Sequence, residues 1–327
     1  MKQLTLKASF TLSGKGLHTG AFLTATFNPA PDNHGYKIRR IDLDGQPVID
    51  AVAENVIATT RGTVIGKGDV TVSTIEHAMS ALYAAGIDNC LIDVDGAEIP
   101  ILDGSAKPWF DAIAAVGTEE QKSDKEFYYV KHKMEVTDAD SGSKLMLLPD
   151  DEFSVDVKVN FESPVLSNQY ATMDHISTYG EEIASARTFV FLREIEPLLQ
   201  ANLIKGGDLA NAVVIYDSAM PQEALDRIAD QMGAERRRIN DFGYINPDGL
   251  KHQNEPARHK LMDLIGDIAL IGRPLKGRII ATRPGHTINT TLAKKIRNDI
   301  KRNEVQAPVY DPNVEPLMDN NAIRHHL

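Results

Sequence analysis

The sequence predicts an α+β fold built from two similar halves. Strand-like segments fill the chain before Ser73 and are followed by a helix, a strand and a second helix, and a similar order begins again after the polar run Gly117–Lys125. The chain has 327 residues, which is long for one hydrophobic core because a domain commonly holds about 100–200 residues. The two halves share no repeat at the level of individual residues, so the predicted duplication depends only on the order of the elements. The alternative interpretation is one large domain.

The first half is predicted to begin with strands, which are rich in Val, Ile and Thr and in places alternate between apolar and polar residues. The segment Thr11–Gly20 is glycine-rich and is predicted to form a turn. Its glycines also suggest a phosphate-binding loop, but no Gly-Lys-Ser/Thr motif and no helical pattern follow them, so a hairpin turn is favoured. The predicted strands are Leu4–Phe10, Ala21–Phe27, Tyr36–Ile49 and Val52–Val64.

The segment Ser73–Gly86 predicts the first helix. Ser73 and Glu76 have the S-x-x-E spacing of a capping box, good helix formers follow them, and the terminal glycine suits the end of a helix. The other elements expected in this half are the buried strand Asp88–Val94, the loop Ile99–Ser105, the helix Ala106–Val116 and the linker Gly117–Lys125.

The second half contains a segment that has no counterpart in the first. Pro221–Gly233 has the pattern of an amphipathic helix that stops at a glycine, and it lies in an insertion over about residues 217–250. We therefore expect domains at residues 1–121 and 122–305, followed by a linker at 306–327. The strands predicted here are Phe127–Val136, Ser143–Leu148, Phe153–Phe161, Tyr170–Thr178, Val213–Tyr216 and Gly277–Thr282; the helices are Glu255–Asp267 and Thr287–Asn303, with a turn or short helix at Tyr179–Ala186.

Composition and charge exclude several classes of protein. The start of the chain does not resemble a signal peptide, and no segment approaches the ~20 apolar residues of a membrane span, so a cytoplasmic protein is expected. The net charge of -11 argues against a nucleic-acid partner. Because Cys90 is the only cysteine, a disulfide framework and a thiolate zinc cluster are excluded, and any metal must be held by His, Asp or Glu.

The predicted helix Glu255–Asp267 carries two candidate metal ligands beside its apolar stripe. His259 and Asp263 are four residues apart, so they lie one above the other on the same face. His77, at the start of the first helix, would complete the set of two imidazoles and one carboxylate that holds a catalytic zinc, and Glu76 would accept a proton from the attacking water. Each residue also has an ordinary structural interpretation, as a cap, a core histidine or a solvated charge, and spacing alone leaves both open.

Six short blocks of the sequence occur in an order that identifies a family. They are Ser73–His77, Gly86–Asn89, Glu98–Ser105, Ala186–Phe189, Arg258–Asp267 and Gly285–Asn289. Together they closely resemble the zinc-dependent UDP-3-O-acyl-N-acetylglucosamine deacetylases, which catalyse the committed step of bacterial lipid A biosynthesis, and the resemblance runs from about Leu4 to Asn303. The family fold implies two similar α/β domains packed helix to helix as a sandwich.

The resemblance implies a role for each matching residue of the catalytic site. His77, His259 and Asp263 match the zinc ligands, for which Fe²⁺ is an alternative metal. Glu76 matches the general base; His286 matches the imidazolium that stabilises the oxyanion and protonates the departing amine, and Asp267 matches the carboxylate that orients it. Lys260 and Thr188 match residues that bind and polarise the acetyl carbonyl.

The resemblance also implies how the acylated sugar nucleotide is bound. Phe189 lies where the family packs the sugar or acyl chain, Leu192–Ile204 matches the insert that forms the acyl-chain passage, and His18 matches a motif near the substrate. Glu194 departs from the Asp of many relatives, and the insertion is longer than is usual. The ending Ile323–Leu327 resembles the start of a 3-hydroxyacyl-acyl-carrier-protein dehydratase, which implies a fused dehydratase domain. The alternatives are a hydrolase of another N-acylated amine and a non-catalytic, metal-stabilised protein that binds a sugar nucleotide.

Overall fold

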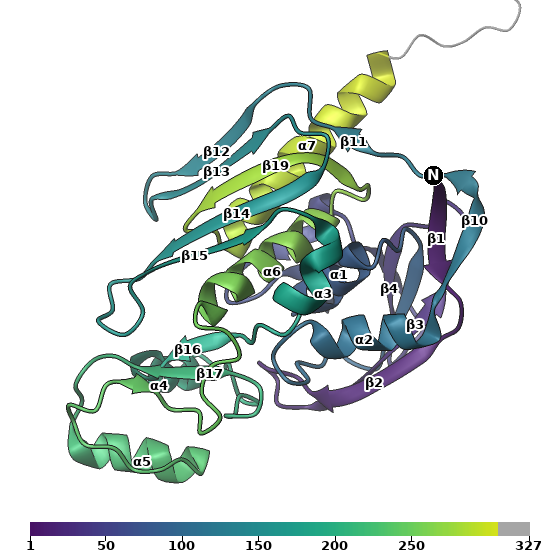
Figure 1. The fold of residues 1–327 in the computed structure, drawn as a ribbon. Coiled ribbons are helices and arrows are strands. Elements are labelled where there is room, and N and C mark those ends of the chain that lie inside the picture. Colours follow the sequence, from purple (N-terminus) through teal and green to yellow (C-terminus); the bar gives the residue numbers. More distant parts are fainter. Residues whose placement is uncertain (307–327) are drawn as a thin grey trace, which may run out of the picture.

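The computed structural model describes residues 1–306, in which two β-sheets enclose a layer of helices (Figure 1). The first sheet has the order β2 (Phe10–Lys15), β3 (Phe22–Pro29), β9 (Cys90–Val94), β4 (Tyr36–Arg40) and β5 (Val48–Asp50). The second has the order β12 (Met134–Asp138), β13 (Ser143–Leu148), β19 (Leu275–Thr282), β14 (Phe153–Asn160) and β15 (Asn168–Met173), and the short β11 (Tyr128–Tyr129) also pairs with β19.

The two sheets have the same topology. In each sheet the central strand is the one that comes last in the chain, β9 in the first and β19 in the second. The central strand pairs in parallel with one neighbour, β4 or β14 respectively. The other neighbouring strands in the two five-strand orders pair antiparallel. One helix precedes each central strand and one follows it. These helices are α1 (Glu76–Ala84) and α2 (Lys107–Val116) in the first half, and α6 (Glu255–Ala269) and α7 (His286–Gln306) in the second. The predicted α+β duplication is confirmed.

Helices α1 and α6 pack against each other at the centre of the molecule (Figure 1). The apolar stripe of α6, including Leu261, Leu264 and Ile265, is fully buried, as its i, i+3, i+4 spacing predicts. On the side that meets α1, a Cβ placed on Gly266 would lie 2.1 Å from the carbonyl oxygen of Glu76. Only glycine therefore allows the two helices to approach this closely at the start of α1.

Smaller elements surround the two main layers. A three-stranded sheet of β6 (Val56–Ala58), β7 (Val64–Lys67) and β8 (Val70–Val72) belongs to the first half. Another, of β16 (Phe189–Phe191), β17 (Val213–Tyr216) and β18 (Gly243–Tyr244), carries α4 (Leu192–Gln200) and α5 (Gln222–Met232). The remaining short elements are the 3-10 helices η1 (Ala53–Asn55) and η2 (Ile176–Thr178) and the helix α3 (Tyr179–Glu182).

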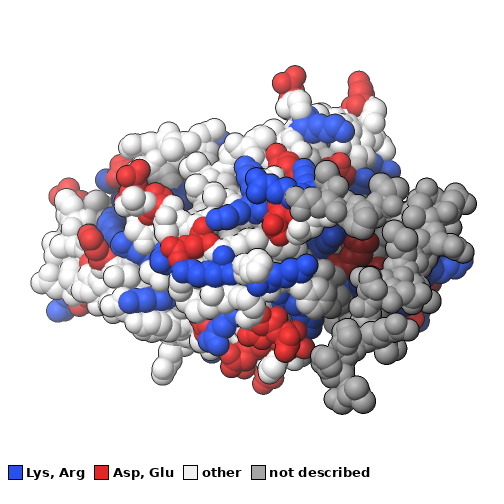
Figure 2. Space-filling view, turned by 90° about the horizontal axis from the view of Figure 1, so that it is seen from above, with Lys and Arg blue, Asp and Glu red and all other residues white. Residues whose placement is uncertain are grey.

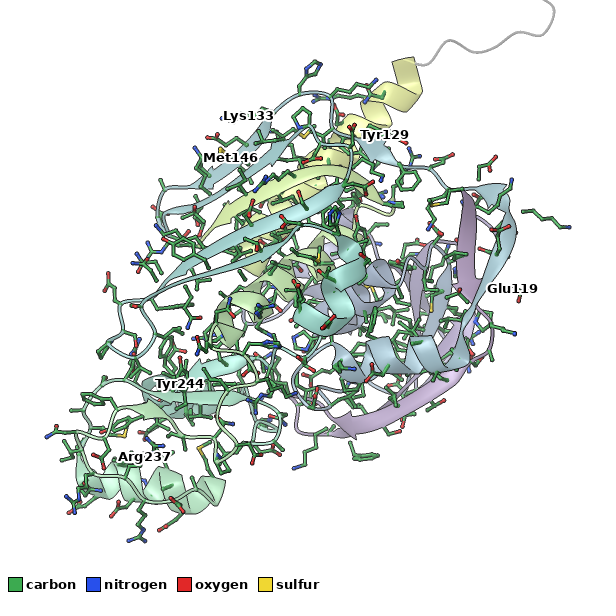
Figure 3. All side chains as sticks on the ribbon, in the orientation of Figure 1. Glu119, Tyr129, Lys133, Met146, Arg237 and Tyr244 are labelled. Atoms are coloured by element: carbon green, nitrogen blue, oxygen red, sulfur yellow. The ribbon has the colours of Figure 1, made fainter. Side chains whose placement is uncertain are left out.

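The expected insertion is folded rather than irregular. Its helix α5 agrees with the predicted Pro221–Gly233, and Gly233 ends it in the left-handed conformation with φ of 64°. After the helix the chain returns to the sheet, where the guanidinium of Arg237 donates a hydrogen bond of 2.6 Å to the carbonyl oxygen of Tyr244. Figure 3 labels both residues, which lie in the same outer part of the molecule as α5.

The predicted linker Gly117–Lys125 is wrong, because most of it is a strand. Strand β10 (Thr118–Asp124) pairs antiparallel with β1 (Lys2–Leu6). The predicted strand Leu4–Phe10 is likewise divided between β1 and β2, and the start of the predicted turn Thr11–Gly20 is strand. The proposed limit between the domains, at residues 121 and 122, falls within β10, and both domain limits stay predictions.

The predicted capping box is also wrong. The Ser73 hydroxyl donates its hydrogen bond to the carbonyl oxygen of Ala97 (3.1 Å), and helix α1 begins only at Glu76, after an N-cap at Ile75 that has no side-chain cap. Between them Thr74 has a φ of 57°, a conformation that is strained for a β-branched residue. The Thr74 hydroxyl donates to Glu98 (3.0 Å), which helps to hold this conformation. As a result the carboxylate of Glu76 is not used as a cap.

On the surface, basic and acidic side chains are interspersed over the face seen in Figure 2. Cross-strand ion pairs of the second sheet, such as Arg278–Asp156 at 2.6 Å and Lys144–Glu135 at 3.0 Å, have the same mixed character. Within residues 1–306 no helix combines the length and apolar character needed to cross a bilayer. The C-terminal segment that was expected to begin a dehydratase lies outside the described residues, since it belongs to residues 307–327.

Candidate active site

Three buried side chains converge where helices α1 and α6 meet. His77 comes from the first turn of α1, and His259 and Asp263 come from one face of α6. The Oδ1 atom of Asp263 lies 3.3 Å from Nε2 of His259 and 3.7 Å from Nε2 of His77. One ligand atom from each residue lies within 4.8 Å of the other two, and this is the only such cluster that the described residues form. The structure thus brings together the three ligands predicted from opposite halves of the chain.

The protonation states of these residues suit a divalent metal. Burial, reinforced by His259, lowers the pKa of His77 to about 3, and burial also lowers the pKa of His259. Burial would raise the pKa of Asp263, but the neighbouring His259 and Lys260 outweigh it and hold the pKa well below its usual range. The cluster therefore consists of two neutral imidazoles and one carboxylate, and the two His–Asp contacts are not ion pairs.

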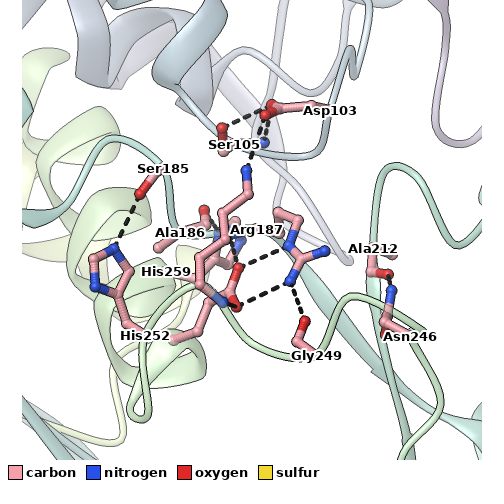
Figure 4. Close-up of polar contacts among 12 residues, drawn as sticks. Asp103, Ser105, Ser185, Ala186, Arg187, Ala212, Asn246, Gly249, His252 and His259 are labelled. Atoms are coloured by element: carbon pink, nitrogen blue, oxygen red, sulfur yellow. Dashed lines mark hydrogen bonds and ion pairs between the residues drawn. The ribbon is translucent and has the colours of Figure 1, made fainter.

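The hydrogen bonds around the cluster leave its inner atoms free. Nδ1 of His259 lies 3.0 Å from the carbonyl oxygen of Ala186 (Figure 4), so this nitrogen carries the proton and Nε2 presents a lone pair. The Oδ1 atom of Asp263 is buried and has no hydrogen-bond partner among the described residues. A buried carboxylate oxygen without a partner is costly, and a metal would satisfy it. We conclude that the donor set fits a divalent metal.

A buried ion pair holds the Ala186 carbonyl in place. The Arg187 guanidinium contacts Glu255 at 2.8 Å, and the Arg187 backbone N–H donates to the same carboxylate at 3.0 Å (Figure 4). Glu255 is the first residue of α6 and is fully buried. The other carboxylate oxygen accepts the backbone N–H of Lys251 at 2.7 Å. This network attaches the segment Ala186–Phe189 to the start of the helix that carries His259 and Asp263.

Glu76 lies beside the three ligands with its carboxylate directed into the pocket. It is 3 % exposed, and one oxygen accepts the backbone N–H of Thr63 at 3.0 Å. Burial raises the pKa of Glu76 to about 7; the positive charge of His286 opposes this effect, while Asp263 and Asp267 add to it. A carboxylate with this pKa can both take up and release a proton near neutral pH.

His286 lies on the other side of Glu76 and is held by Asp267. Nδ1 of His286 donates to Asp267 at 3.0 Å, and its Nε2 faces Glu76 and Asp263, each at 3.8 Å. Burial alone would lower the pKa of His286, but Asp267 and Glu76 outweigh it and raise the pKa to about 9. The site therefore places a candidate base and an imidazolium side by side, as the sequence predicts.

Three residues without a predicted role complete this arrangement. The Thr63 hydroxyl donates to Asp267 at 2.5 Å, and Asn289 donates to the same carboxylate at 2.9 Å. Glu98 is fully buried and accepts the backbone N–H groups of His18 and Thr19, both at 2.9 Å. Asn289 and Glu98 stand in the recognised blocks, so their motifs could have indicated them. Thr63 has no local signal, because it looks like one more β-branched residue in a predicted strand.

The remaining predicted residues lie around a pocket of about 350 Å³ in front of the cluster. Lys260 contacts Asp263 at 2.9 Å, and its ammonium group lies 5.6 Å from the ring centroid of Phe189. Thr188 and Phe189 also line the pocket. His18 does not line it; this residue faces a neighbouring cavity, where burial lowers its pKa. Thr188 and Phe189 line this cavity too, so His18 stays beside the other candidates although it does not line the pocket in front of the cluster.

The neighbouring cavity has a volume of about 340 Å³ and a mainly apolar wall. It adjoins the pocket of about 350 Å³ in front of the cluster, which we call the catalytic pocket, because Leu17, Arg61, Thr188 and Phe189 line both spaces. The predicted segment Leu192–Ile204 supplies part of the wall through Ile195, Leu198 and Ile204. Glu194, which departs from the family pattern, forms an ion pair of 3.0 Å with Arg61.

Comparison with known proteins places the chain beside one group of enzymes. The family model described as UDP-3-O-acyl N-acetylglycosamine deacetylase matches residues 3–232 and 238–298. The bifunctional enzyme LpxC/FabZ of Porphyromonas gingivalis is 60% identical to this chain over 326 residues, which cover 100% of this chain and 71% of the relative. The bifunctional enzyme LpxC/FabZ of Bacteroides thetaiotaomicron is 60% identical over 327 residues, which also cover 100% of this chain and 71% of the relative. The UDP-3-O-acyl-N-acetylglucosamine deacetylase of Myxococcus xanthus is 38% identical over 298 residues, covering 91% of this chain and 87% of the relative.

Proposed function

Because this chain belongs to the UDP-3-O-acyl-N-acetylglucosamine deacetylase family, we propose that it removes the N-acetyl group with the help of Zn²⁺ held by His77, His259 and Asp263. The reaction, a hydrolysis in lipid A biosynthesis, gives the free 2-amino sugar nucleotide and acetate. The observation that carries the metal assignment is the unpartnered, buried Oδ1 of Asp263 beside two neutral imidazoles. Fe²⁺ would fit the same donors.

The bound metal would lower the pKa of a coordinated water to about 7 and polarise the acetyl carbonyl. Glu76 is proposed to take the proton from the attacking water, since its carboxylate adjoins the ligands and has a pKa of about 7. As the oxygen bonds to the carbonyl carbon, Thr188 and Lys260 would bind the carbonyl oxygen from the wall of the pocket.

His286 is proposed to complete the reaction. Its raised pKa keeps the imidazole protonated at neutral pH, so it stabilises the developing oxyanion and then donates a proton to the sugar nitrogen as the C–N bond breaks. Asp267 orients the ring through Nδ1, and Thr63 and Asn289 hold Asp267 in turn. The proton therefore leaves from Nε2, the atom that faces the pocket.

The substrate is proposed to occupy both cavities. The sugar would lie in the catalytic pocket, and its 3-O-acyl chain would enter the apolar cavity past Phe189. We also propose that the chain is the deacetylase part of a protein with a fused dehydratase domain, because relatives at 60% identity are bifunctional enzymes of which the match covers 71%.

The assignment is tested by acetate release from UDP-3-O-acyl-N-acetylglucosamine. The purified, zinc-loaded protein is expected to release acetate and to act far more slowly on UDP-N-acetylglucosamine, which lacks the acyl chain. Binding of the nucleotide sugar without acetate release would favour the alternative of a binding protein. Faster hydrolysis of an unrelated N-acylated amine would favour a different hydrolase.

The rate of deacetylation is expected to depend on pH in a bell shape. It should rise as Glu76 loses its proton, with a pKa of about 7, and fall as His286 loses its proton, with a pKa of about 9. A bound cation favours the deprotonated form of each group, so both limbs would move to lower pH. The two apparent values belong to the interacting pair. Measurement of kcat/KM against pH tests this, and a rate that stayed constant on the acidic side would contradict the role of Glu76.

A further inference from the structure

Helix α5 forms the far wall of the apolar cavity. Ile228 and Met232 line this cavity, and neither residue lines the catalytic pocket. The helix also packs through Leu225 and Ile228 into an apolar cluster with Leu192, Val214 and Tyr216. The helix is thus an integral part of this cavity, although it belongs to the segment that has no counterpart in the first half.

The same two side chains also border a second, much smaller space. A void of about 10 Å³ lies behind α5 and is lined by Leu225, Ala229 and Ala234 together with Ile228 and Met232. Because Ile228 and Met232 line both spaces, they lie between them, and we call this pair of side chains the partition. Truncation of either side chain would extend the cavity toward the void, and a larger side chain would shorten it.

The cavity adjoins the catalytic pocket at Thr188 and Phe189, which line both spaces. The lining of the cavity is mainly apolar and includes residues from β16, α4 and β17, among them Val190, Ile195 and Val214. An acyl chain that enters beside Thr188 and Phe189 would run along this lining toward α5. Its last methylene groups would meet Ile228 and Met232.

We propose that Ile228 and Met232 are the residues that determine the length of acyl chain accepted by this enzyme. The inference rests on the proposed function, since it takes the 3-O-acyl group as the occupant of the cavity. Each methylene that the cavity can hold should raise kcat/KM about 4-fold. A chain that reaches the partition can go no further without displacing packed side chains, so kcat/KM should then fall.

The test uses the zinc-loaded protein and a series of UDP-3-O-acyl-N-acetylglucosamines whose acyl chains are lengthened two carbons at a time. Met232→Ala and Ile228→Ala are expected to move the preferred chain to a longer length, and Met232→Trp to a shorter one. The measured quantity is the ratio of kcat/KM for an acyl chain two carbons longer than the wild-type optimum to kcat/KM for the optimum acyl chain. This ratio should be about 10-fold higher in Met232→Ala than in the wild-type protein.

Leu225→Ala is the matched control. This residue is buried on the same helix and lines the void but not the cavity, so its truncation removes packing while the partition remains. The control is expected to lower the unfolding temperature and to keep the wild-type length preference. Unchanged preferences in Met232→Ala, Ile228→Ala and Met232→Trp, or an equal shift in Leu225→Ala, would overturn the proposal. Absence of acetate release by the wild-type protein would instead contradict the proposed function itself.

Discussion

Removal of the metal by a chelator is expected to lower deacetylation by at least about 10³-fold, because a catalytic metal stabilises the transition state by several kcal/mol. Addition of Zn²⁺ should restore the rate. The His259→Gln variant should show the same loss of deacetylation without a chelator, because the substitution replaces one of the two neutral imidazoles by a carboxamide. Acetate release and bound zinc are measured together on the same samples.

The control for this prediction is the fold of the metal-free protein. The central helices are joined by a fully buried apolar core that includes Met79, Leu82 and Leu261, so the stripped protein should retain its circular dichroism spectrum. A structural zinc site would behave differently, because its loss unfolds the protein. Unfolding on chelation, with no activity regained on adding zinc, would contradict the catalytic assignment.

Glu76→Gln is expected to lower kcat by about 10²–10⁴-fold, the usual contribution of a positioned acid or base. The glutamine side chain has nearly the same shape, and its amide oxygen can still accept the backbone N–H of Thr63. It cannot take a proton from water. Bound zinc should remain, because His77, His259 and Asp263 are unchanged.

The sharper comparison is with Glu98→Gln. Glu98 is a second fully buried glutamate, but it binds the His18–Thr19 backbone and does not line the catalytic pocket. Its replacement should reduce stability without an equal loss of kcat in the protein that remains folded. Full turnover by a zinc-loaded Glu76→Gln variant would rule out Glu76 as the base.

Much of the fold could be predicted because its signals are local. The spacing of His259 and Asp263 on a helix, and the apolar stripe beside them, needed only the helical period. Strand β10 had no such signal, since Thr118–Asp124 is polar throughout. It is a strand because β1 supplies its hydrogen bonds, and a partner more than a hundred residues away is invisible to a local pattern.

The difference between local signals and long-range contacts also explains which residues of the site could be predicted. The capping box failed because Thr74 adopts a positive φ, which moves the start of α1 to Glu76 and directs its carboxylate into the pocket. No spacing rule predicts this turn. Thr63 was missed since its contacts with Glu76 and Asp267 join three separate parts of the chain. The partition formed by Ile228 and Met232 likewise depends on how α5 packs rather than on its amphipathic pattern.

The contact of Gly266 with the backbone of Glu76 has a consequence for the order of events during folding. His77 belongs to a helix that is synthesised long before α6, and neither half alone contains the three proposed ligands. Closing this long-range contact is entropically costly until much of both halves has formed. A newly made chain would therefore bind its metal late, after α1 and α6 have packed together. Binding of the metal would then indicate that both halves of the chain have folded.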